Sequence, residues 1–370
     1  MKLNIPENIK KITPYPPGKP LDELEREFGI TDSIKLASNE NAWGPSPKAI
    51  EAIKASLGDL HRYPDGSGYY LTQAIAARFE VLPEEVVLGN GSNEIIEFLV
   101  KAFVREGDEV ITSHPSFLMY QKFVQVRAGV NKVIPLQDMH HDLNAIVDAV
   151  TDKTRLIFID NPNNPTGTFI SPKELDSFFK RIPESVIVAL DEAYVDFMEK
   201  ELQGDIRELI DDVEGRCPVV LLRTFSKAYG ISGLRVGFGL MSAPIAGCLH
   251  KVRQPFNINS LAQIGAKAAL EDNVYFDMVI NETRSGMRSL MEAVERLGCT
   301  SYPSQTNFFL IDVKGNANDL YTAMLYKGVI VRSMNAYGFP TCIRITVGTK
   351  EENERFVKAL ADCLKELKYV

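Results

Sequence analysis

Reactive and polar side chains follow three short apolar runs in the middle of the chain. The runs are residues 156–159, 186–190 and 219–222, and the segments after them include Asn164, Asp191, Tyr194 and Lys227. If the runs are parallel strands, these groups meet at one edge of a sheet, because ligands of open parallel sheets bind beyond the carboxyl ends of the strands. One polar loop after a strand indicates little, since most strands end in such loops. The three together predict a binding site.

These side chains match the needs of pyridoxal 5'-phosphate (PLP), a cofactor that bonds covalently to an amine. Lys227 supplies the amine, and a partly buried position near cations would lower its pKa so that it acts as a nucleophile and then as a general base. Asp191 supplies the anion that keeps the pyridine nitrogen of the cofactor protonated. The phosphate of the cofactor requires hydrogen-bond donors, which must come from another part of the chain.

The segment GNGSNE (89–94) offers a place for that phosphate. An apolar face over residues 95–104 predicts a helix that begins at Ser92, which can cap it, and that Gly107 stops. The glycines let backbone N–H groups approach an anion at the positive end of this helix. A glycine before a helix is more often only a turn, so this segment needs support from elsewhere. The side chains that could complete the phosphate site are Ser226 and Arg235.

Helical patterns alternate with short apolar runs from about residue 47, and this order predicts an α/β protein with a mostly parallel sheet between helices. A second α/β unit follows a long helical pattern over 273–298, with expected strands at 308–313, 329–331 and 343–347. Thr349 and Glu352 have capping-box spacing at the start of the last helix. We expect an N-terminal arm that joins the small domain at 1–46, a large domain at 47–265 and a small C-terminal domain at 266–370.

Composition and charge exclude several classes of function. The 370 residues are 45% apolar and 24% charged and carry a formal net charge of -8, which argues against nucleic acid or an anionic membrane as a partner. The N-terminal sequence lacks the apolar stretch of a signal peptide, and the five cysteines contain no CxxC pair, as in a reducing compartment. The histidines lack metal-ligand spacing, so no metal site is expected. A cytoplasmic protein that acts on small molecules fits these features.

Eight short motifs occur in order along nearly the whole chain. They are LASNENAWGPSP (36–47), RYPDG (62–66), GNGSNE (89–94), SHPSF (113–117), NPNNPTG (161–167), LDEAY (190–194), TFSKAYGISGLRVG (224–237) and CIRITVGT (342–349). This set resembles the fold-type I PLP-dependent aminotransferases, and specifically the class II-like histidinol-phosphate aminotransferase family. The resemblance implies a large domain, whose mostly parallel sheet lies between helices, and a smaller α/β domain.

The resemblance also implies a role for each residue at the predicted site. Lys227 would form the Schiff base with PLP, and Asp191 would pair with the pyridinium nitrogen. Asn164 and Tyr194 would hydrogen-bond the phenolic oxygen of the cofactor. The expected catalytic residues are therefore Lys227, Asp191 and Tyr194. The residues expected around the phosphate are Ser92, Asn93, Ser226 and Arg235.

Two aromatic residues gain a role only through the resemblance. Phe117 is expected to stack on the ring of the cofactor. Tyr63 is expected to reach the phosphate bound by a neighbouring subunit, which implies a homodimer. Taken alone, both would more often be core or interface aromatics.

Three residues are implied at the substrate besides Asn164. Arg344, in CIRITVGT, is expected to bind an α-carboxylate, because a guanidinium matches the geometry of a carboxylate. Arg332, in VIVRSM, is expected to meet a distal phosphate together with Tyr15 of the arm. A second arginine would serve equally well for the side-chain carboxylate of a dicarboxylic donor, so Arg332 indicates a distal anion without naming it.

The implied reaction is PLP-dependent transamination between L-histidinol phosphate and 2-oxoglutarate, which gives imidazole acetol phosphate and L-glutamate in histidine biosynthesis. The nearest alternative is an aromatic amino acid aminotransferase on the same scaffold, because an aromatic ring could occupy the place of the imidazole. A PLP-dependent threonine-phosphate decarboxylase is a further alternative, since it would use the same lysine and aspartate.

Overall fold

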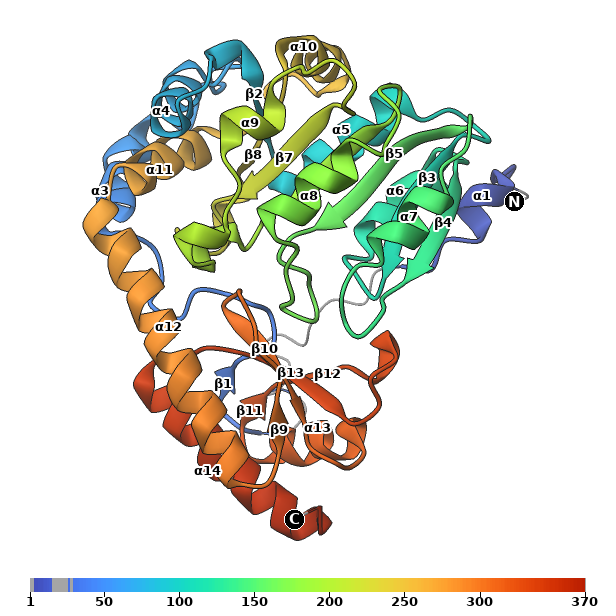
Figure 1. The fold of residues 1–370 in the computed structure, drawn as a ribbon. Helices are drawn as coiled ribbons and strands as arrows, with labels where there is room; N and C mark the ends of the chain where they lie inside the picture. The colour runs from blue at the N-terminus through green and yellow to red at the C-terminus, as the bar shows by residue number, and fades with distance from the viewer. Residues whose placement is uncertain (1–2, 15–25, 27–28, 370) are drawn as a thin grey trace.

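The computed structural model describes residues 3–14, 26 and 29–369 of the chain. Figure 1 shows a larger body, built on a sheet between helices, and a smaller body that carries the C-terminus. The long helix α12 (Asn273–Arg296) leaves the larger body and runs along one side of the smaller body. No helix in the described part of the chain is long and apolar enough to span a membrane.

Seven strands form the sheet of the larger body, in the order β2-β8-β7-β6-β5-β3-β4. They are β2 (Val86–Gly89), β3 (Glu109–His114), β4 (Val130–Pro135), β5 (Thr154–Asp160), β6 (Ile187–Asp191), β7 (Val219–Thr224) and β8 (Gly237–Leu240). β8 is antiparallel to both neighbours, and the other neighbouring pairs are parallel. The predicted α/β fold is confirmed, and the three predicted strands are β5, β6 and β7.

Helices cover both faces of this sheet (Figure 1). They are α3 (Pro47–Ser56), α4 (Tyr69–Phe79), α5 (Ser92–Phe103), α6 (Met119–Val126), α7 (Leu143–Asp148), α8 (Pro172–Phe179), α9 (Ile206–Ile210), α10 (Ala243–Val252) and α11 (Ser260–Leu270). Short 3-10 helices are η1 (Leu57–Asp59), η2 (Pro83–Glu85), η3 (Val195–Phe197), η4 (Lys200–Leu202) and η5 (Ser232–Leu234). The expected domain boundary at 265/266 falls inside α11, which packs in the core of the larger body. The division into domains stays a prediction.

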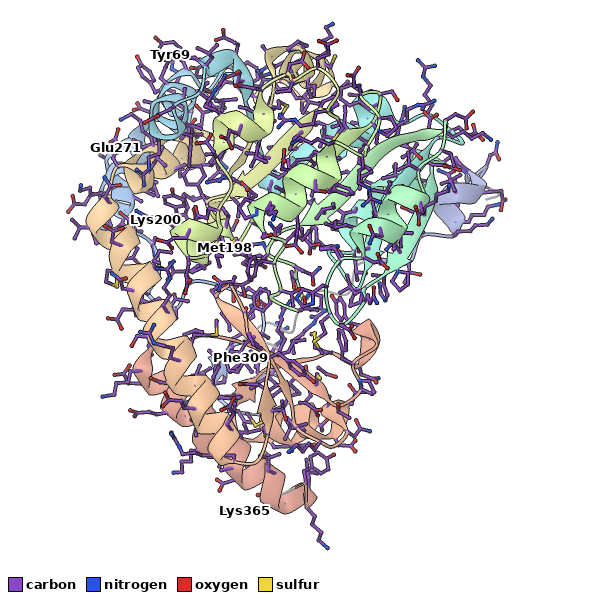
Figure 2. All side chains as sticks on the ribbon, in the orientation of Figure 1. Tyr69, Met198, Lys200, Glu271, Phe309 and Lys365 are labelled. Carbon is purple, nitrogen blue, oxygen red and sulfur yellow. The ribbon has the colours of Figure 1, made fainter. Side chains whose placement is uncertain are left out.

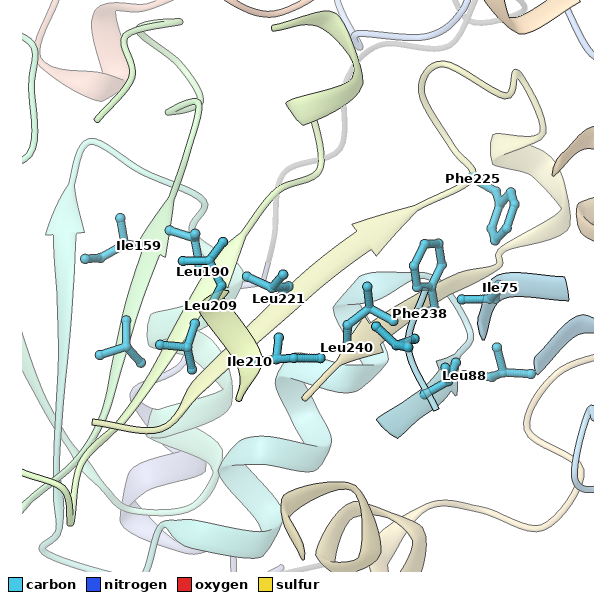
Figure 3. Close-up of a cluster of buried hydrophobic side chains, with 14 of the residues drawn as sticks. Ile75, Leu88, Ile159, Leu190, Leu209, Ile210, Leu221, Phe225, Phe238 and Leu240 are labelled. Atoms are coloured by element: carbon cyan, nitrogen blue, oxygen red, sulfur yellow. The ribbon is translucent and has the colours of Figure 1, made fainter. Parts of the chain in front are cut away.

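Side chains that alternate along β5 pack into separate cores on the two faces of the sheet. Ile157 and Ile159 belong to the core that includes residues of α8, and Leu156 and Phe158 belong to the core that includes residues of α5. Figure 3 shows Ile159 near side chains of the neighbouring strands in the first of these cores. Because both faces are covered, the strand has no polar face, which explains its continuous apolar sequence.

Helix α5 begins at Ser92 as expected, but its N-cap and its last residue differ from the expectation. The N-cap residue is Gly91, with φ +77°, and among the described residues the Ser92 side chain makes no capping hydrogen bond. The predicted cap is therefore wrong, because the turn requires a positive φ that glycine adopts without strain. The helix ends at Phe103, earlier than the expected stop at Gly107. Val104 is β-branched and already extended, with φ -110° and ψ 126°.

In the described part of the chain, two sheets form the smaller body. The antiparallel sheet has the order β12-β13-β10-β9, with strands β9 (Thr300–Ser301), β10 (Phe308–Asp312), β12 (Arg332–Ser333) and β13 (Cys342–Thr346). A separate parallel pair joins β1 (Ile34–Lys35) to β11 (Val329–Ile330). The expected strand at 329–331 is thus short, and the chain passes from β11 into β12 of the other sheet within a few residues.

Helices α12, α13 (Ala317–Tyr326) and α14 (Lys350–Leu367) cover these sheets, and η6 (Asn335–Tyr337) follows β12. Phe309 of β10, labelled in Figure 2, is fully buried in the core that these helices share with the strands. The predicted capping box at the start of α14 is confirmed. Thr349 Oγ1 accepts a hydrogen bond from the N–H of Glu352 (3.3 Å), and Glu352 Oε2 accepts one from the N–H of Thr349 (2.8 Å).

The N-terminal region contacts both bodies. In α1 (Glu7–Lys10), the Asn8 side chain donates to the carbonyl oxygens of Gln125 and Val126 of α6, both at 3.0 Å. Further along the chain, β1 belongs to the smaller body. Tyr15, which the resemblance implied at the substrate, lies outside the described residues.

Candidate active site

The ends of β5, β6 and β7 bring the predicted polar segments together. Asp160 and Asp191 are direct partners at the last residues of β5 and β6, and Lys227 follows shortly after the end of β7. The Lys227 ammonium lies 5.5 Å from the centre of the Tyr194 ring. Parallel strands thus place a lysine, an aspartate and a tyrosine at one edge of the sheet, as their order in the sequence predicts.

Lys227 is held by backbone oxygens of the segment that follows β1. Its Nζ donates hydrogen bonds to the carbonyl oxygens of Asn39 (3.1 Å) and Ser38 (3.5 Å). Burial, followed by the nearby Arg344 guanidinium, lowers the pKa of Lys227 to about 8. A lysine with this pKa has an appreciable neutral fraction near neutral pH, and the neutral amine is the form that attacks a carbonyl carbon.

Asp191 is a buried carboxylate with two hydrogen-bond donors. Tyr120 Oη donates to its Oδ2 (2.8 Å), and the N–H of Ala193 donates to its Oδ1 (3.1 Å). Burial raises the pKa of Asp191 to about 7, the Tyr120 hydrogen bond opposes this shift, and the charge of Asp160 adds to it. Because the main cause is the loss of water around the carboxylate, a cation placed against Asp191 would restore its ionised form.

Tyr194 Oη accepts hydrogen bonds from two side-chain amides. Asn39 Nδ2 lies at 2.8 Å and Asn164 Nδ2 at 3.4 Å. Burial raises the pKa of Tyr194 to about 12, although the charge of Arg344 opposes the shift. The phenol therefore stays protonated around neutral pH and keeps one O–H to donate.

Arg332 and Arg344 lie directly opposite each other on β12 and β13. Arg344 is buried and donates to Asn164 Oδ1 and, at 3.0 Å, to the carbonyl oxygen of Ala37. Its guanidinium also lies 4.9 Å from the centre of the Phe308 ring. Directly opposed residues of an antiparallel pair project from the same face, where two like charges repel each other. Such a pair of arginines is favourable where an anion binds between them.

The start of α5 and the segment before β8 form a second cluster of donors. The N–H groups of Ser92 and Asn93 lie in the first turn of α5, where a helix offers no internal acceptor. The Arg235 guanidinium packs against Gly91 so closely that a Cβ there would collide with it. Arg235 Nη1 also donates to Ser226 Oγ (3.4 Å). A helix N-terminus, a guanidinium and a hydroxyl at one place can bind a phosphate.

The two predicted aromatic residues lie in different surroundings. Phe117 packs edge-on against Tyr120, with ring centroids 5.5 Å apart, and this places it next to the residue that holds Asp191. Tyr63 is 84% exposed and stacks on Phe256, with ring centroids 5.0 Å apart. Tyr63 therefore faces away from the core and is accessible to a second chain.

Asn39, Tyr120 and Asp160 belong to the site but were not identified as site residues from the sequence. Asp160 accepts hydrogen bonds from the N–H of Asn164 and from Ser116 Oγ, both at 2.8 Å, and so fixes the loop that carries Asn164. Its position directly before the NPNNPTG motif was the available signal. Tyr120 lies on the amphipathic helix α6 and resembles a core aromatic, whereas Asn39 lies within a motif that was assigned no role.

We predict that replacing Asp191 by Asn stabilises the ligand-free protein at pH 8. Above pH 7 the folded wild type buries an ionised carboxylate, whereas the unfolded chain ionises this group above about pH 4. Wild-type stability therefore falls as the pH rises from about 4 to about 7, and the Asn variant avoids this loss. Urea unfolding should show a gain of about 2–4 kcal/mol at pH 8 that disappears near pH 4.

Tyr120→Phe is the matched control, because it removes the hydrogen bond to Asp191 and leaves the charge. It should lower the free energy of unfolding at pH 8, opposite to Asp191→Asn. An Asp191→Asn variant with the wild-type pH dependence would show that the burial of this carboxylate has no energetic cost.

Comparison with known proteins identifies the family. Residues 31–360 match the family model described as aminotransferase class I and II. A histidinol-phosphate aminotransferase of Desulfotalea psychrophila is 68% identical over 370 residues, which are 100% of this chain and 98% of that protein. A histidinol-phosphate aminotransferase of Moorella thermoacetica is 42% identical over 358 residues, which are 97% of this chain and 92% of that protein.

A solved structure has the same fold. Histidinol-phosphate aminotransferase from Sinorhizobium meliloti, in complex with pyridoxal-5'-phosphate, superposes with a TM-score of 0.92 over 99% of both chains at 26% identity. The expected fold-type I architecture is thereby confirmed, as is the resemblance that the motifs showed. The chain belongs to the aminotransferases of class I and II.

Proposed function

We propose that the protein is a PLP-dependent enzyme of histidine biosynthesis that transfers an amino group between L-histidinol phosphate and 2-oxoglutarate. The observation that carries the choice of substrate is the direct pairing of Arg332 with Arg344. Histidinol phosphate bears a dianionic phosphate close to its amine, and two adjacent guanidinium groups suit a dianion. The 68% identity to a histidinol-phosphate aminotransferase over the full chain supports the same choice.

The donor set of the site fits PLP. Lys227 offers an amine of lowered pKa, and Asp191 offers a buried carboxylate whose ionised form needs a cation beside it. A group that carries both a carbonyl carbon and a basic ring nitrogen meets both requirements. The residues that would hold its phosphate are Ser92, Asn93, Ser226 and Arg235, those at its phenolic oxygen are Asn164 and Tyr194, and the one beside its ring is Phe117.

When bound, PLP supplies a protonated ring that accepts the electron pair left at the substrate α-carbon. Asp191 keeps the proton on the ring nitrogen, because an ionised carboxylate against that nitrogen favours the charged form of both groups. Lys227 would move a proton to and from the substrate α-carbon through Nζ. Its pKa of about 8 lies close enough to neutral pH for transfer in both directions.

Arg344 and Asn164 orient the substrate. Arg344 holds the Asn164 amide by its oxygen, and this turns the amide nitrogen towards Tyr194 Oη. The same arginine would bind the α-carboxylate of glutamate in one half of the reaction and share the phosphate of histidinol phosphate with Arg332 in the other. Tyr15 stays a proposed partner of that phosphate.

Two other reactions could use the same residues. An aromatic amino acid aminotransferase would place a phenyl ring where we place the imidazole, and a threonine-phosphate decarboxylase would release CO₂ instead of a keto product. The products distinguish these reactions from the one proposed. Rapid reaction with phenylalanine and none with histidinol phosphate would show that the substrate is an aromatic amino acid. CO₂ release without a keto product would identify a decarboxylase.

We predict that Arg332→Gln lowers kcat/KM for histidinol phosphate about 100-fold and that for phenylalanine less than about 5-fold, because only the first donor loses an ion pair. The rate at which each donor removes the yellow colour of the holoenzyme measures this difference. Arg296→Gln is the matched control, since Arg296 is an exposed residue of α12 that pairs with Glu292 at 3.8 Å. Equal losses for both donors in Arg332→Gln would contradict a phosphate-binding role.

The cellular location of the enzyme and its partners other than PLP are also proposed. A cytoplasmic enzyme without nucleic-acid or membrane partners agrees with the acidic composition and the formal net charge of -8. The proposed partners are the small-molecule substrates and a second copy of this chain.

The surface around Tyr63 supports the proposal that a second copy of this chain binds there. Several large side chains close together in the sequence are exposed in this region. They are Leu57, Leu60, Tyr63, Tyr69 and Tyr70. An exposed group of this kind is typical of an interface. In a homodimer, the Tyr63 hydroxyl would reach the phosphate bound by the other subunit, as the resemblance implies.

We predict that the protein sediments as a dimer and that Tyr63→Phe remains a dimer with about tenfold weaker PLP affinity, because one hydrogen bond to a charged group is lost. Tyr326→Phe, at an exposed tyrosine of α13, is the control and should keep wild-type affinity. Monomeric wild-type protein that binds PLP with full affinity would exclude this role of Tyr63.

A further inference from the structure

Asn39 lies at the centre of a hydrogen-bond network that joins Tyr194, Lys227 and Thr346. It is 2% exposed and has a left-handed backbone conformation, with φ +54°. Asparagine tolerates this conformation better than most residues that have a side chain. Its side-chain amide donates to Tyr194 Oη at 2.8 Å, which is the shorter of the two amide contacts of that oxygen.

The backbone of Asn39 is fixed by the smaller body. Its N–H donates to Thr346 Oγ1 (2.9 Å) on β13, and its carbonyl oxygen accepts from Asn307 Nδ2 (3.2 Å). The same carbonyl oxygen accepts from Lys227 Nζ at 3.1 Å. One residue thus connects β13, the Lys227 amine and the Tyr194 hydroxyl.

The contacts of the side chain define which end of the amide faces Tyr194. Thr346 Oγ1 accepts from the Asn39 N–H, so its own hydrogen is available for Asn39 Oδ1, which lies 3.4 Å away. Asn39 Nδ2 is then the end that faces Tyr194 Oη. An amide NH₂ can only donate, so Tyr194 must accept this hydrogen bond.

The direction of the Tyr194 O–H follows from these contacts. The oxygen accepts from Asn39 and, more weakly, from Asn164, so both amides lie on its lone-pair side. The single hydrogen of the phenol must point away from both donors, because donors repel each other. It remains available to an acceptor in the site.

We propose that Asn39 is a positioning residue that directs the Tyr194 O–H onto the phenolic oxygen of bound PLP. The inference rests on the PLP role proposed above for Tyr194. It does not require that histidinol phosphate is the substrate. A holoenzyme that binds PLP at Lys227 but fails to use histidinol phosphate would overturn the proposed reaction and leave this inference testable.

The visible spectrum of the holoenzyme should depend on the direction of the Tyr194 O–H. In PLP bonded to Lys227, the negative charge of the phenolic oxygen would favour a proton on the linking nitrogen. A hydrogen bond from Tyr194 draws this charge away, so the proton leaves at lower pH. Losing the correctly directed O–H should therefore move the spectral transition of the holoenzyme to higher pH.

Asn39→Gly is the main test, because glycine adopts φ +54° without strain and keeps the backbone contacts while removing the amide. We expect the spectral transition to move up by about half to one pH unit. Asn39→Asp is the second variant. Its carboxylate would attract the Tyr194 O–H away from the cofactor and should move the transition further in the same direction.

A double-mutant cycle with Tyr194→Phe separates positioning from every other effect. If Asn39 acts through the Tyr194 hydroxyl, Asn39→Gly should leave the transition of Tyr194→Phe holoenzyme unchanged. An equal shift with and without the hydroxyl would overturn the proposal, and so would the absence of any shift in both Asn39 variants.

Asn307→Leu controls for a purely structural role. It removes the donor that holds the Asn39 carbonyl oxygen but keeps the Asn39 amide and its contacts with Thr346 and Tyr194. We expect a lower unfolding temperature of the PLP-free protein, because a buried carbonyl oxygen loses one of its donors, and a spectral shift smaller than that of Asn39→Gly. A spectral shift as large as that of Asn39→Gly would assign the effect to anchoring of the segment and reject the role of the amide.

Discussion

The burial of Asp191 at the end of a central strand is the constraint on which the rest of the site depends. The carboxylate is removed from water, and this raises its pKa to about 7. Tyr120 compensates in part by donating a hydrogen bond, whereas Asp160, its partner on β5, adds a like charge. Above about pH 7, where the carboxylate is ionised, a cation against Asp191 compensates its buried charge. In our account the protonated ring of PLP is that cation, so stability of the ligand-free protein is given up for cofactor binding.

The smaller body supplies the positive charge on the other side of the site. Arg344 contributes to the lowered pKa of Lys227, and it fixes Asn164 through the oxygen of its amide. The carbonyl oxygens of Ser38 and Asn39 hold the Lys227 amine. The lysine on the larger body is thus tuned by groups from the smaller body and from the segment after β1. Any change in how the two bodies sit therefore changes the chemistry of Lys227.

The sequence predicted those parts of the site that local patterns define. Strand β6 is covered on both faces and reads as an apolar run, so the polar residue that ends it, Asp191, is conspicuous. Asn39 and Tyr120 were not predicted as site residues, because their contacts join residues 155 and 71 positions apart and no local sequence pattern shows such contacts. The cap of α5 was misplaced because the sequence does not show whether Gly91 or Ser92 forms the turn.

The central claim is that these groups are assembled around a cofactor bonded to Lys227. Reduction of the holoenzyme with borohydride, followed by mass-spectrometric mapping of the peptides, tests it most directly. We expect the reduced cofactor to be attached to Nζ of Lys227 and the yellow absorption to be lost in proportion. Attachment to a different lysine, or full loss of the colour with unmodified Lys227, would contradict it.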